Sequence, residues 1–314
     1  MLGRAVVRHC RSAGDEVFAH DHQSLDISHA ETVSALFMSE RPETVINCAA
    51  WTDVDGCELD PQRAFAANAR GPEVLAAACR EIGAQLITIS TDYVFDGAKE
   101  GFYTQRDDPR PESVYGIAKL EGERRAQGAL ARTIVVRSGW IFGPGGRNFL
   151  SRVLELALNP EPLTAITDAY GTPTYALDLA RRLRELAALD LPGIYHIVNS
   201  GEGASYAEFT RAALAAAGDE TARVESVRME ALKRPAPRPR NSRLRCLLSE
   251  AIGLQPLPDW RTALKEFATA GAETRSGQSL VLLCQVAPWS AWRSMEEGFS
   301  RASLHGPPWP SIVI

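Results

Sequence analysis

Short apolar runs alternate with longer, alanine-rich amphipathic stretches along the first two-thirds of the chain. The apolar runs are rich in β-branched residues, as strands covered on both faces tend to be. They lie at residues 16–20, 44–48, 85–90, 133–137 and 193–198. The stretches between them that we expect to be helical are 2–12, 30–39, 61–82 and 115–128. This alternation of strand and helix predicts an α/β fold with a doubly wound parallel sheet.

The alternation weakens beyond about Phe149, which marks the start of a second region. We predict a capped helix over 205–217 and a last amphipathic helix over 260–268. Between them, three prolines in Arg234–Arg240 exclude regular structure, because proline fixes φ and removes a hydrogen-bond donor. The expected divisions are residues 1–145, which the strand near 193–198 rejoins, residues 146–270, and an atypical tail of 271–314. Disorder is one interpretation of that tail.

The composition is that of an ordinary globular protein, and it argues against some classes of partner. Of the 314 residues, 45% are hydrophobic and 23% are charged, which is enough to build a core. The net charge of −5 argues against a nucleic-acid partner, because such proteins need a concentrated positive field. The cysteines have no CxxC spacing, and we find neither a secretory signal nor an apolar run of membrane-spanning length. We expect a cytoplasmic protein with no membrane partner.

The strongest chemical signal is the run Ser90–Gly97 (STDYVFDG) followed by Tyr115–Lys119 (YGIAK). Tyr115 and Lys119 are four residues apart on a predicted helix, so their side chains share one face. A lysine ammonium beside a phenol lowers the tyrosine pKa, which suits a general acid. Thr91 ends a predicted strand, at the sheet edge where open α/β folds bind ligands. An isolated tyrosine–lysine pair is commonly a helix-surface feature, but the preceding run favours the catalytic interpretation.

In these and further segments the chain resembles the dTDP-4-dehydrorhamnose reductase family of extended short-chain dehydrogenase/reductases. The matching segments, between about residues 2 and 268, are 45–55, 90–97, 115–119, 137–143, 168–174, 195–196 and 240–244. The resemblance implies a Rossmann-like NAD(P)-binding domain over 1–145 and a smaller C-terminal substrate-binding domain over 146–270. It also implies reduction of the C4 keto group of dTDP-4-dehydro-β-L-rhamnose to dTDP-β-L-rhamnose, for surface polysaccharide synthesis, by a monomer or homodimer.

The resemblance also implies roles for individual residues. Thr91, Tyr115 and Lys119 would be catalytic, with Tyr115 as proton donor to the C4 oxygen and Lys119 also holding the nicotinamide ribose. The implied cofactor-binding residues are Gly3, Asp21, Asp26, Ile27, Ala49, Ala50, Asn68, Tyr115 and Lys119. The implied substrate-binding residues are Thr52, Val54, Tyr93 and Trp140. A largely apolar lining suits the methyl group of a 6-deoxy sugar.

Several of these positions have a structural alternative. Trp140 and Tyr93 are also compatible with plain core packing, and we expect His196 to be structural. The segment Arg234–Arg240 either contacts the substrate diphosphate or is a solvated loop. The carboxylate of Asp21 favours NADH, because it repels a 2′-phosphate, whereas the resemblance implies NADPH. We therefore expect NADPH or NADH as the cofactor.

The chain departs from the family at its start, at residue 5 and in its tail. Family members open with a buried strand and a GxxGxxG turn. In this chain only the last glycine of that turn has a counterpart, Gly3. That strand belongs at the sheet centre, so we expect its neighbours to keep unpaired backbone groups that cost about 1–3 kcal/mol each. Our hypothesis is that the gene start was set too late. Ala5 replaces a glutamate that binds magnesium in some members, so we expect no required metal.

Two other classes of function remain open on sequence grounds. The same catalytic residues serve nucleotide-sugar epimerases and reductases of other 4-keto sugars, although Thr52, Val54 and Trp140 favour the rhamnose pathway. A relative of the family is the non-catalytic, cofactor-binding regulatory subunit of methionine adenosyltransferase. The presence of the motifs does not exclude that role, but the retained sugar-pocket residues favour an enzyme.

Overall fold

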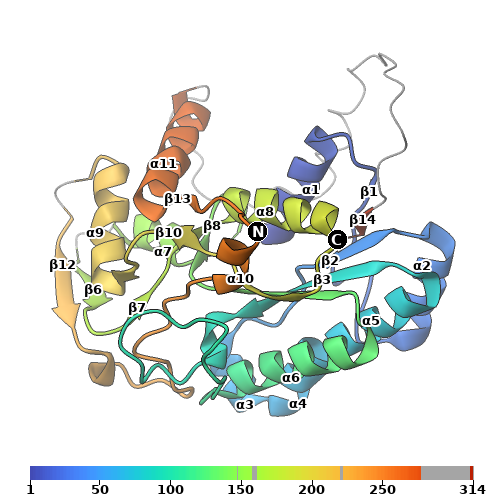
Figure 1. Ribbon diagram of the computed structural model, residues 1–314. Helices are drawn as coiled ribbons and strands as arrows, with labels where there is room; N and C mark the ends of the chain where they lie inside the picture. The colour runs from blue at the N-terminus through green and yellow to red at the C-terminus, as the bar shows by residue number, and fades with distance from the viewer. Residues whose placement is uncertain (147, 158–160, 220–221, 277–311, 314) are drawn as a thin grey trace.

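The centre of the molecule is a parallel β-sheet (Figure 1). The computed structural model of the chain describes residues 1–146, 148–157, 161–219, 222–276 and 312–313. Within these residues the sheet has six strands in the order β1-β14-β2-β3-β4-β9, and all neighbours are parallel. The strands are β1 (Val17–Phe18), β14 (Ile312–Val313), β2 (Thr44–Asn47), β3 (Gln85–Thr91), β4 (Thr133–Ser138) and β9 (Gly193–His196). The prediction of a Rossmann-like α/β fold is confirmed.

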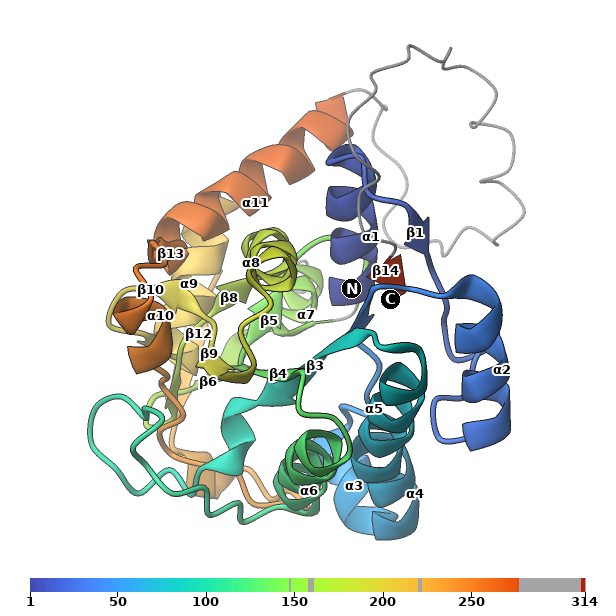
Figure 2. The same ribbon diagram turned by 45° about the vertical axis from the view of Figure 1, so that its right-hand side comes forward.

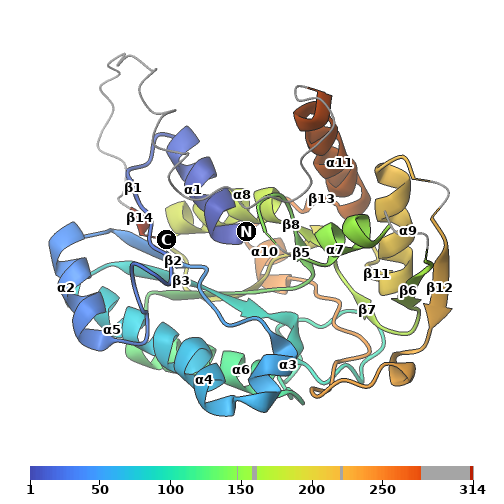
Figure 3. The same cartoon turned by 180° about the vertical axis from the view of Figure 1, so that it is seen from behind.

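Helices cover both faces of this sheet (Figures 1 and 3). One face carries α1 (Leu2–Ser12) and α8 (Ala176–Leu189), and the other carries α2 (Ala30–Glu40), α5 (Gly71–Ile82) and α6 (Val114–Ala129). Successive strand residues serve opposite faces: Ile46 and Ile87 pack in the core under α1 and α8. Val45 and Leu86 pack instead in the core under α2 and α5. Burial on both faces explains why the strands are continuous apolar runs in the sequence.

The predicted helix over 61–82 is interrupted in the structure. It consists of α4 (Pro61–Phe65), a π-helical turn η1 (Ala66–Arg70) and α5. Pro72 has no N–H to donate to the preceding turn, which weakens regular α-helical bonding there. The turn contains the buried Asn68, whose amide donates to the Trp51 carbonyl and accepts from the Trp51 N–H, both at 3.0 Å. Asn68 therefore holds the backbone that follows β2, and π turns of this kind are frequent at functional sites.

A second region follows β4 and is built from short strand pairs and helices. The pairs are β5 (Ile141–Phe142) with β8 (Thr174–Tyr175), β6 (Leu163–Ile166) with β12 (Val224–Val227), β7 (Tyr170–Gly171) with β11 (Ala204–Ser205), and β10 (Asn199–Ser200) with β13 (Leu257–Asp259). The main helices are α7 (Phe149–Leu156), α9 (Tyr206–Ala216) and α11 (Trp260–Ser276), at the end of the molecule away from α2 (Figure 2). An aromatic core that includes Phe142, Phe209 and Trp260 packs between them.

Shorter elements connect these parts. They are α3 (Val54–Leu59), η2 (Asp92–Val94), η3 (Met229–Ala231) and α10 (Leu247–Ala251). The segment Arg234–Arg240 has neither helix nor strand, as its prolines predict. α9 is capped as expected, because the Ser205 hydroxyl accepts from the Glu208 N–H while the Glu208 carboxylate accepts from the Ser205 N–H. Among the described helices, none combines the length and hydropathy that a bilayer span requires.

The centre of the sheet differs from the expectation of an empty strand position. β14, from the C-terminal end of the chain, lies between β1 and β2 and is parallel to both (Figure 2). Its residues Ile312 and Val313 pair with Val17 and Phe18 on one side and with Thr44 and Val45 on the other. The expectation that β1 and β2 keep unpaired backbone groups at this position was therefore wrong. A segment from any part of the chain can supply the backbone pairing. Of the expected tail, 277–311 lie outside the described residues, and α11 extends to Ser276.

Substitution of Val313 by proline tests the contribution of β14. We expect the free energy of unfolding to fall by about 1–3 kcal/mol, because proline cannot donate to the ladder and leaves an interior backbone group unpaired. Urea unfolding followed by circular dichroism measures the change. Val313→Ala is the matched control, since it shortens the side chain but keeps the N–H. Equal stability of the proline variant and the wild type would exclude a contribution of this strand.

Candidate active site

The catalytic candidates gather where β3 ends. Thr91 is the last residue of β3, and α6 begins directly after Ser113, its N-cap. This start puts Tyr115 in the first turn of α6, where its phenol is hydrogen-bonded to the Thr91 hydroxyl. Lys119 lies one turn further along the same helix face. The fold thus brings together the three residues that the sequence nominated.

Lys119 is buried, with 4% of its surface exposed, and its ammonium group is firmly held. Its Nζ donates a hydrogen bond of 2.6 Å to the carbonyl oxygen of Ile89, in β3. Burial lowers the pKa of Lys119 to about 8, while the carboxylate of Glu123 acts in the opposite direction. Lys119 is therefore charged at neutral pH but loses its proton not far above it.

The phenol of Tyr115 has a raised pKa, so the expectation that Lys119 lowers it was wrong. Burial is the main cause of the rise, the hydrogen bond with Thr91 opposes it, and the charges of Asp92 and Cys57 add to it. The ammonium of Lys119 is directed at a backbone carbonyl and does not offset the burial of the phenol. A raised pKa keeps Tyr115 protonated at neutral pH, which is the form that a proton donor requires.

Asp92 is a buried carboxylate that the sequence analysis did not select. Burial raises its pKa to about 6, and hydrogen bonds from the Ser242 and Thr91 hydroxyls oppose this rise. Its Oδ1 accepts from the Thr91 hydroxyl at 3.1 Å. Gly139 makes room for it, because a Cβ at that position would lie 2.4 Å from the Asp92 carboxyl carbon. The signal was available in the sequence, since Asp92 directly follows Thr91 in the STDYVFDG run.

Trp140 and Tyr206 form an aromatic shelf beside Tyr93. Their rings stack with centroids 3.9 Å apart, and the Tyr93 hydroxyl donates to the Tyr206 hydroxyl. The Tyr93 ring meets the Tyr115 ring edge-on, with centroids 6.0 Å apart, so the shelf continues to the candidate proton donor. Trp140 is half-buried and has a φ of 47°, which is strained for a bulky residue. Such strain is typical of functional sites.

Two features of this shelf were not visible in the sequence. In the sequence, Tyr206 is only the first residue of a predicted capped helix, and nothing in its spacing links it to Trp140. The Trp140 indole also depends on Gly171, because a Cβ at that position would lie 2.2 Å from the ring. Both contacts join segments that are more than thirty residues from Trp140 in the chain.

Val54 and Thr52, the other nominated substrate residues, lie at the start of α3. Val54 is half-buried and packs in one apolar cluster with Tyr93 and Tyr115. Thr52 is exposed and precedes Asp53, which caps α3 by accepting from a backbone N–H. The structure therefore brings Val54 next to the catalytic candidates and leaves Thr52 at the open edge of the same loop.

The segment Arg234–Arg240 is anchored to α3 by an ion pair. The two Nη atoms of Arg238 contact the two carboxylate oxygens of Asp55, at 2.5 and 2.8 Å. The Ala236 N–H donates to the same carboxylate at 3.1 Å. These contacts hold the pKa of Asp55 below its usual range. The segment is therefore anchored to α3, and the charge of Arg238 is paired, while Arg234, Pro235, Pro237 and Arg240 are exposed.

A cavity of about 480 Å³ adjoins this segment, between α7, β6 and α9. Arg234 and Arg152 contribute two cations to its lining, and Glu155 contributes one carboxylate. Phe149 also lines it, and the Phe149 ring meets the Tyr206 ring with centroids 5.1 Å apart. An aromatic row thus runs from the cavity through the shelf to the catalytic candidates. The volume lies within the range typical of small-molecule pockets, about 300–1,000 Å³.

The residues nominated for a cofactor lie along the carboxyl ends of β1 and β2. Ala49 and Ala50 follow β2 and are exposed, and Asn68 holds the backbone just beyond them. Asp21 and Asp26 follow β1 and are also exposed. Hydrogen bonds from their own turns lower the pKa of both carboxyl groups, so both are negatively charged at neutral pH. This edge therefore presents two carboxylates next to a strip of small side chains.

Ile27 and Gly3 complete the nominated set. Ile27 packs closely against Gly71, where a Cβ would lie 2.6 Å from the Ile27 Cδ1. Gly3 is in the first turn of α1, which Met1 precedes as N-cap. A helix N-terminus attracts anions because its first N–H groups are unpaired and the helix dipole is positive there. The two residues thus occupy opposite sides of the same sheet edge, one apolar and one suited to a phosphate.

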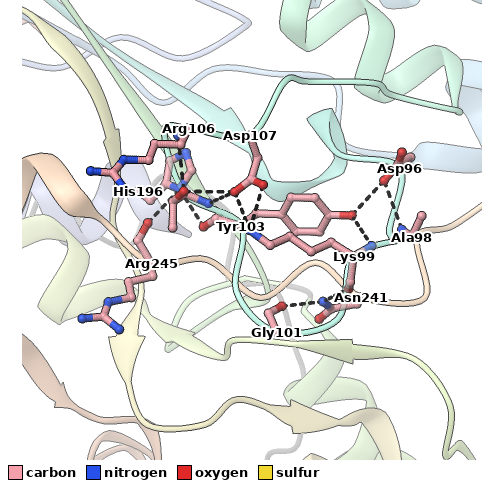
Figure 4. Close-up of polar contacts among 11 residues, drawn as sticks. Asp96, Ala98, Lys99, Gly101, Tyr103, Arg106, Asp107, His196, Asn241 and Arg245 are labelled. Carbon is pink, nitrogen blue, oxygen red and sulfur yellow. Dashed lines mark hydrogen bonds and ion pairs between the residues drawn. The ribbon is translucent and has the colours of Figure 1, made fainter.

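The connection between η2 and α6 is held by a network around Tyr103 (Figure 4). Tyr103 donates to Asp96 at 2.8 Å, and the Asn241 amide donates to the carbonyls of Lys99 and Gly101, both at 2.6 Å. The Nδ1 of His196 donates to the Tyr103 carbonyl at 3.2 Å. Burial lowers the pKa of His196 to about 4, so its ring is neutral. These contacts indicate a structural role: they fix the loop that joins the two catalytic segments.

The side chains that commonly bind metals do not cluster in the described part of the chain. No group of three or more His, Cys, Asp or Glu side chains there could hold a metal ion. Ala5 is buried in α1. Cys10, Cys48, Cys57, Cys79 and Cys246 are free thiols. Cys284 lies outside the described residues.

Comparison with known proteins gives one consistent result. The family described as RmlD substrate binding domain matches residues 1–272. The dTDP-4-dehydrorhamnose reductase of Streptomyces griseus is 39% identical over 272 residues, which cover 85% of this chain and 89% of the relative. The crystal structure of a dTDP-4-dehydrorhamnose reductase from Clostridium acetobutylicum aligns with a TM-score of 0.83 at 35% identity, over 86% and 96% of the two chains. That of the Bacillus anthracis reductase in complex with NADP has a TM-score of 0.83 at 30% identity, over 86% and 95%.

Proposed function

The chain belongs to the RmlD substrate-binding domain family, and on that basis we propose that it reduces the C4 keto group of dTDP-4-dehydro-β-L-rhamnose to give dTDP-β-L-rhamnose. NADPH or NADH is the proposed reductant. The observation that carries the proposal is the contact of the Thr91 hydroxyl with the Tyr115 phenol, next to the buried Lys119. A protonated phenol at the carboxyl end of a parallel strand is suited to protonate a substrate oxygen.

The proposed step uses Tyr115 as the general acid. When bound, the reduced nicotinamide supplies a hydride to the C4 carbon. Tyr115 gives its proton to the C4 oxygen, which becomes the new hydroxyl group. The raised pKa of Tyr115 supports this role because the phenol keeps its proton until negative charge develops on that oxygen. Thr91 orients the phenol, and Lys119, one helical turn away on the same face, would hold the nicotinamide ribose.

The aromatic shelf and the adjoining cavity support a nucleotide-sugar substrate. Trp140, Tyr93 and Val54 offer an apolar surface for a 6-deoxy sugar, whose methyl group makes no hydrogen bond. The cavity that Phe149 links to this surface is a suitable receptor for the nucleotide end. Arg234 in its lining is suited to the diphosphate, because a guanidinium matches phosphate oxygens.

The residues at the carboxyl ends of β1 and β2 fit a dinucleotide cofactor. Ala49 and Ala50 leave the backbone open to a close approach, and Asp21 is suited to bind ribose hydroxyls. Ile27 offers an apolar contact for adenine, and Gly3 lies beside the N-terminus of α1, where a pyrophosphate is favoured. The negative charge of Asp21 favours NADH, whereas the Bacillus anthracis relative has been crystallised with NADP.

The test is oxidation of NADPH and of NADH by the purified chain with dTDP-4-dehydro-L-rhamnose. We expect one cofactor oxidised for each sugar reduced. A second dTDP-4-keto-6-deoxy sugar, with the opposite configuration at C5, tests the specificity and should be reduced more slowly. Sugar interconversion without net cofactor oxidation would indicate an epimerase. Cofactor binding without either reaction would favour a regulatory subunit.

A further inference from the structure

A buried ion pair lies directly behind the catalytic candidates. Glu123, on α6, and Arg137, on β4, are 3% and 4% exposed. The Nη2 and Nε of Arg137 donate to the Glu123 carboxylate at 2.7 and 2.9 Å. The Ser90 hydroxyl, on β3, donates to the same carboxylate. Glu123 therefore has three donors from two strands, and its position is fixed from the side opposite to solvent.

Glu123 is one turn beyond Lys119 on the same helix face, since the two are four residues apart. The Glu123 carboxylate is the charge that most strongly favours the ammonium form of Lys119. The other groups that act on the lysine are the Ile89 carbonyl on β3 and Cys48 after β2, while Arg137 on β4 contacts Glu123 itself. Burial raises the pKa of Cys48 to about 12, so this thiol is neutral at pH 7 and supplies no charge.

Resting on the proposed function, we propose that Glu123 is a positioning residue that keeps the Lys119 ammonium charged, with Arg137 and Ser90 holding its carboxylate. A buried ammonium needs a nearby anion because the low polarity of its surroundings favours the neutral amine. Glu123 supplies that anion from one helical turn away. Arg137 in turn supplies the cation without which Glu123 would take up a proton.

The alternative is that the pair only stabilises the fold. A buried pair is weak support for that view, because well-packed apolar side chains often stabilise a protein as much. The two interpretations differ in a measurable way. If the pair is only structural, replacing both residues together leaves the pKa of Lys119 unchanged. If Glu123 is a positioning residue, the replacement changes that pKa even when the fold is intact.

The experiment follows the titration of Lys119 directly by NMR of protein labelled with ¹³C-lysine. The chain has only four lysines, Lys99, Lys119, Lys233 and Lys265, so the signals are resolvable, and Lys119→Arg assigns the one of interest. The variants are Glu123→Gln, which keeps the shape of the side chain, and Glu123→Gln/Arg137→Met, which also removes the unpaired cation. Urea unfolding of each variant reports on stability separately.

We expect the pKa of Lys119 to fall by about one unit or more in Glu123→Gln, and to fall by less in the double variant, which also removes the Arg137 cation. The single variant should lose stability because Arg137 remains buried without a partner, and the double variant should recover most of it. The high-pH limb of the kcat profile should move down with the lysine. A Lys119 pKa equal to that of the wild type in the stable double variant would overturn the proposal. Absence of wild-type turnover would instead refute the proposed function, since the lysine titration does not depend on it.

Discussion

Replacement of Tyr115 by phenylalanine is expected to lower kcat by about 10²- to 10⁴-fold, the usual contribution of general acid catalysis. The variant loses only the hydroxyl that is hydrogen-bonded to Thr91, while the ring still meets Tyr93 edge-on. Without that proton, the negative charge that forms on the substrate oxygen has no donor. Stopped assays of NADPH oxidation under saturating substrate measure the effect on the chemical step.

Two controls decide whether the loss is chemical. The affinity for NADPH, followed by quenching of protein fluorescence, should stay within a few-fold of the wild type. Tyr195→Phe is the matched variant, because it also removes one tyrosine hydroxyl, the donor to the Leu191 carbonyl, but on β9. It should keep the wild-type kcat. If Tyr115→Phe retained full turnover, Tyr115 would have no part in the mechanism.

Replacement of Gly116 by alanine is the second substitution with a large expected effect. A Cβ at this position would lie 2.3 Å from the backbone carbonyl oxygen of Tyr93, and a carbonyl cannot rotate away as a flexible side chain can. The start of α6 must therefore move away from η2, and Tyr115 moves with it. Because a displacement of about 1 Å can cost about 10²-fold in rate, we expect kcat/KM to fall by that order. The strain should also lower the free energy of unfolding by about 1–3 kcal/mol.

Gly128→Ala is the matched control on the same helix. No atom lies within 4 Å of a Cβ at that position. Alanine also forms helix better than glycine, by about 1 kcal/mol, so this variant should be as stable as the wild type or more so. Its kcat/KM should be unchanged. Normal activity of Gly116→Ala would mean that α6 accommodates the methyl group without moving the phenol.

Much of the sheet and several helices could be predicted because their signals are local. The predicted helix over 2–12 matches α1, and that over 115–128 differs from α6 by one residue at each end. The run 133–137 matches β4 to within one residue. In each case the spacing of the apolar residues shows which face of that helix or strand is buried, so neighbouring residues in the sequence are sufficient to predict it. The interruption of the 61–82 helix escaped this reasoning, because the bonds between Asn68 and Trp51 depend on a loop 17 residues away.

The candidate site was likewise predictable only in part. The four-residue spacing of Tyr115 and Lys119 predicts a shared helix face, and helix geometry alone is sufficient for that inference. The direction of the Tyr115 pKa was not predictable, because it depends on burial beneath side chains from other elements. Tyr206 was missed for a related reason, because it acquires its role from Trp140, which is distant in sequence. Asp92 directly follows Thr91, but its burial, which sets its pKa, depends on the packed chain.

The sequence by itself thus determined the class of fold, the positions of most core elements and the catalytic candidates, because these follow from short-range periodicity and motif spacing. Only the tertiary structure decided which segment fills the sheet centre, which rings form the shelf, and that Arg137 from β4 meets Glu123 from α6. Strand order and side-chain burial are properties of the packed chain: they depend on which distant residues become neighbours when apolar surface is removed from water.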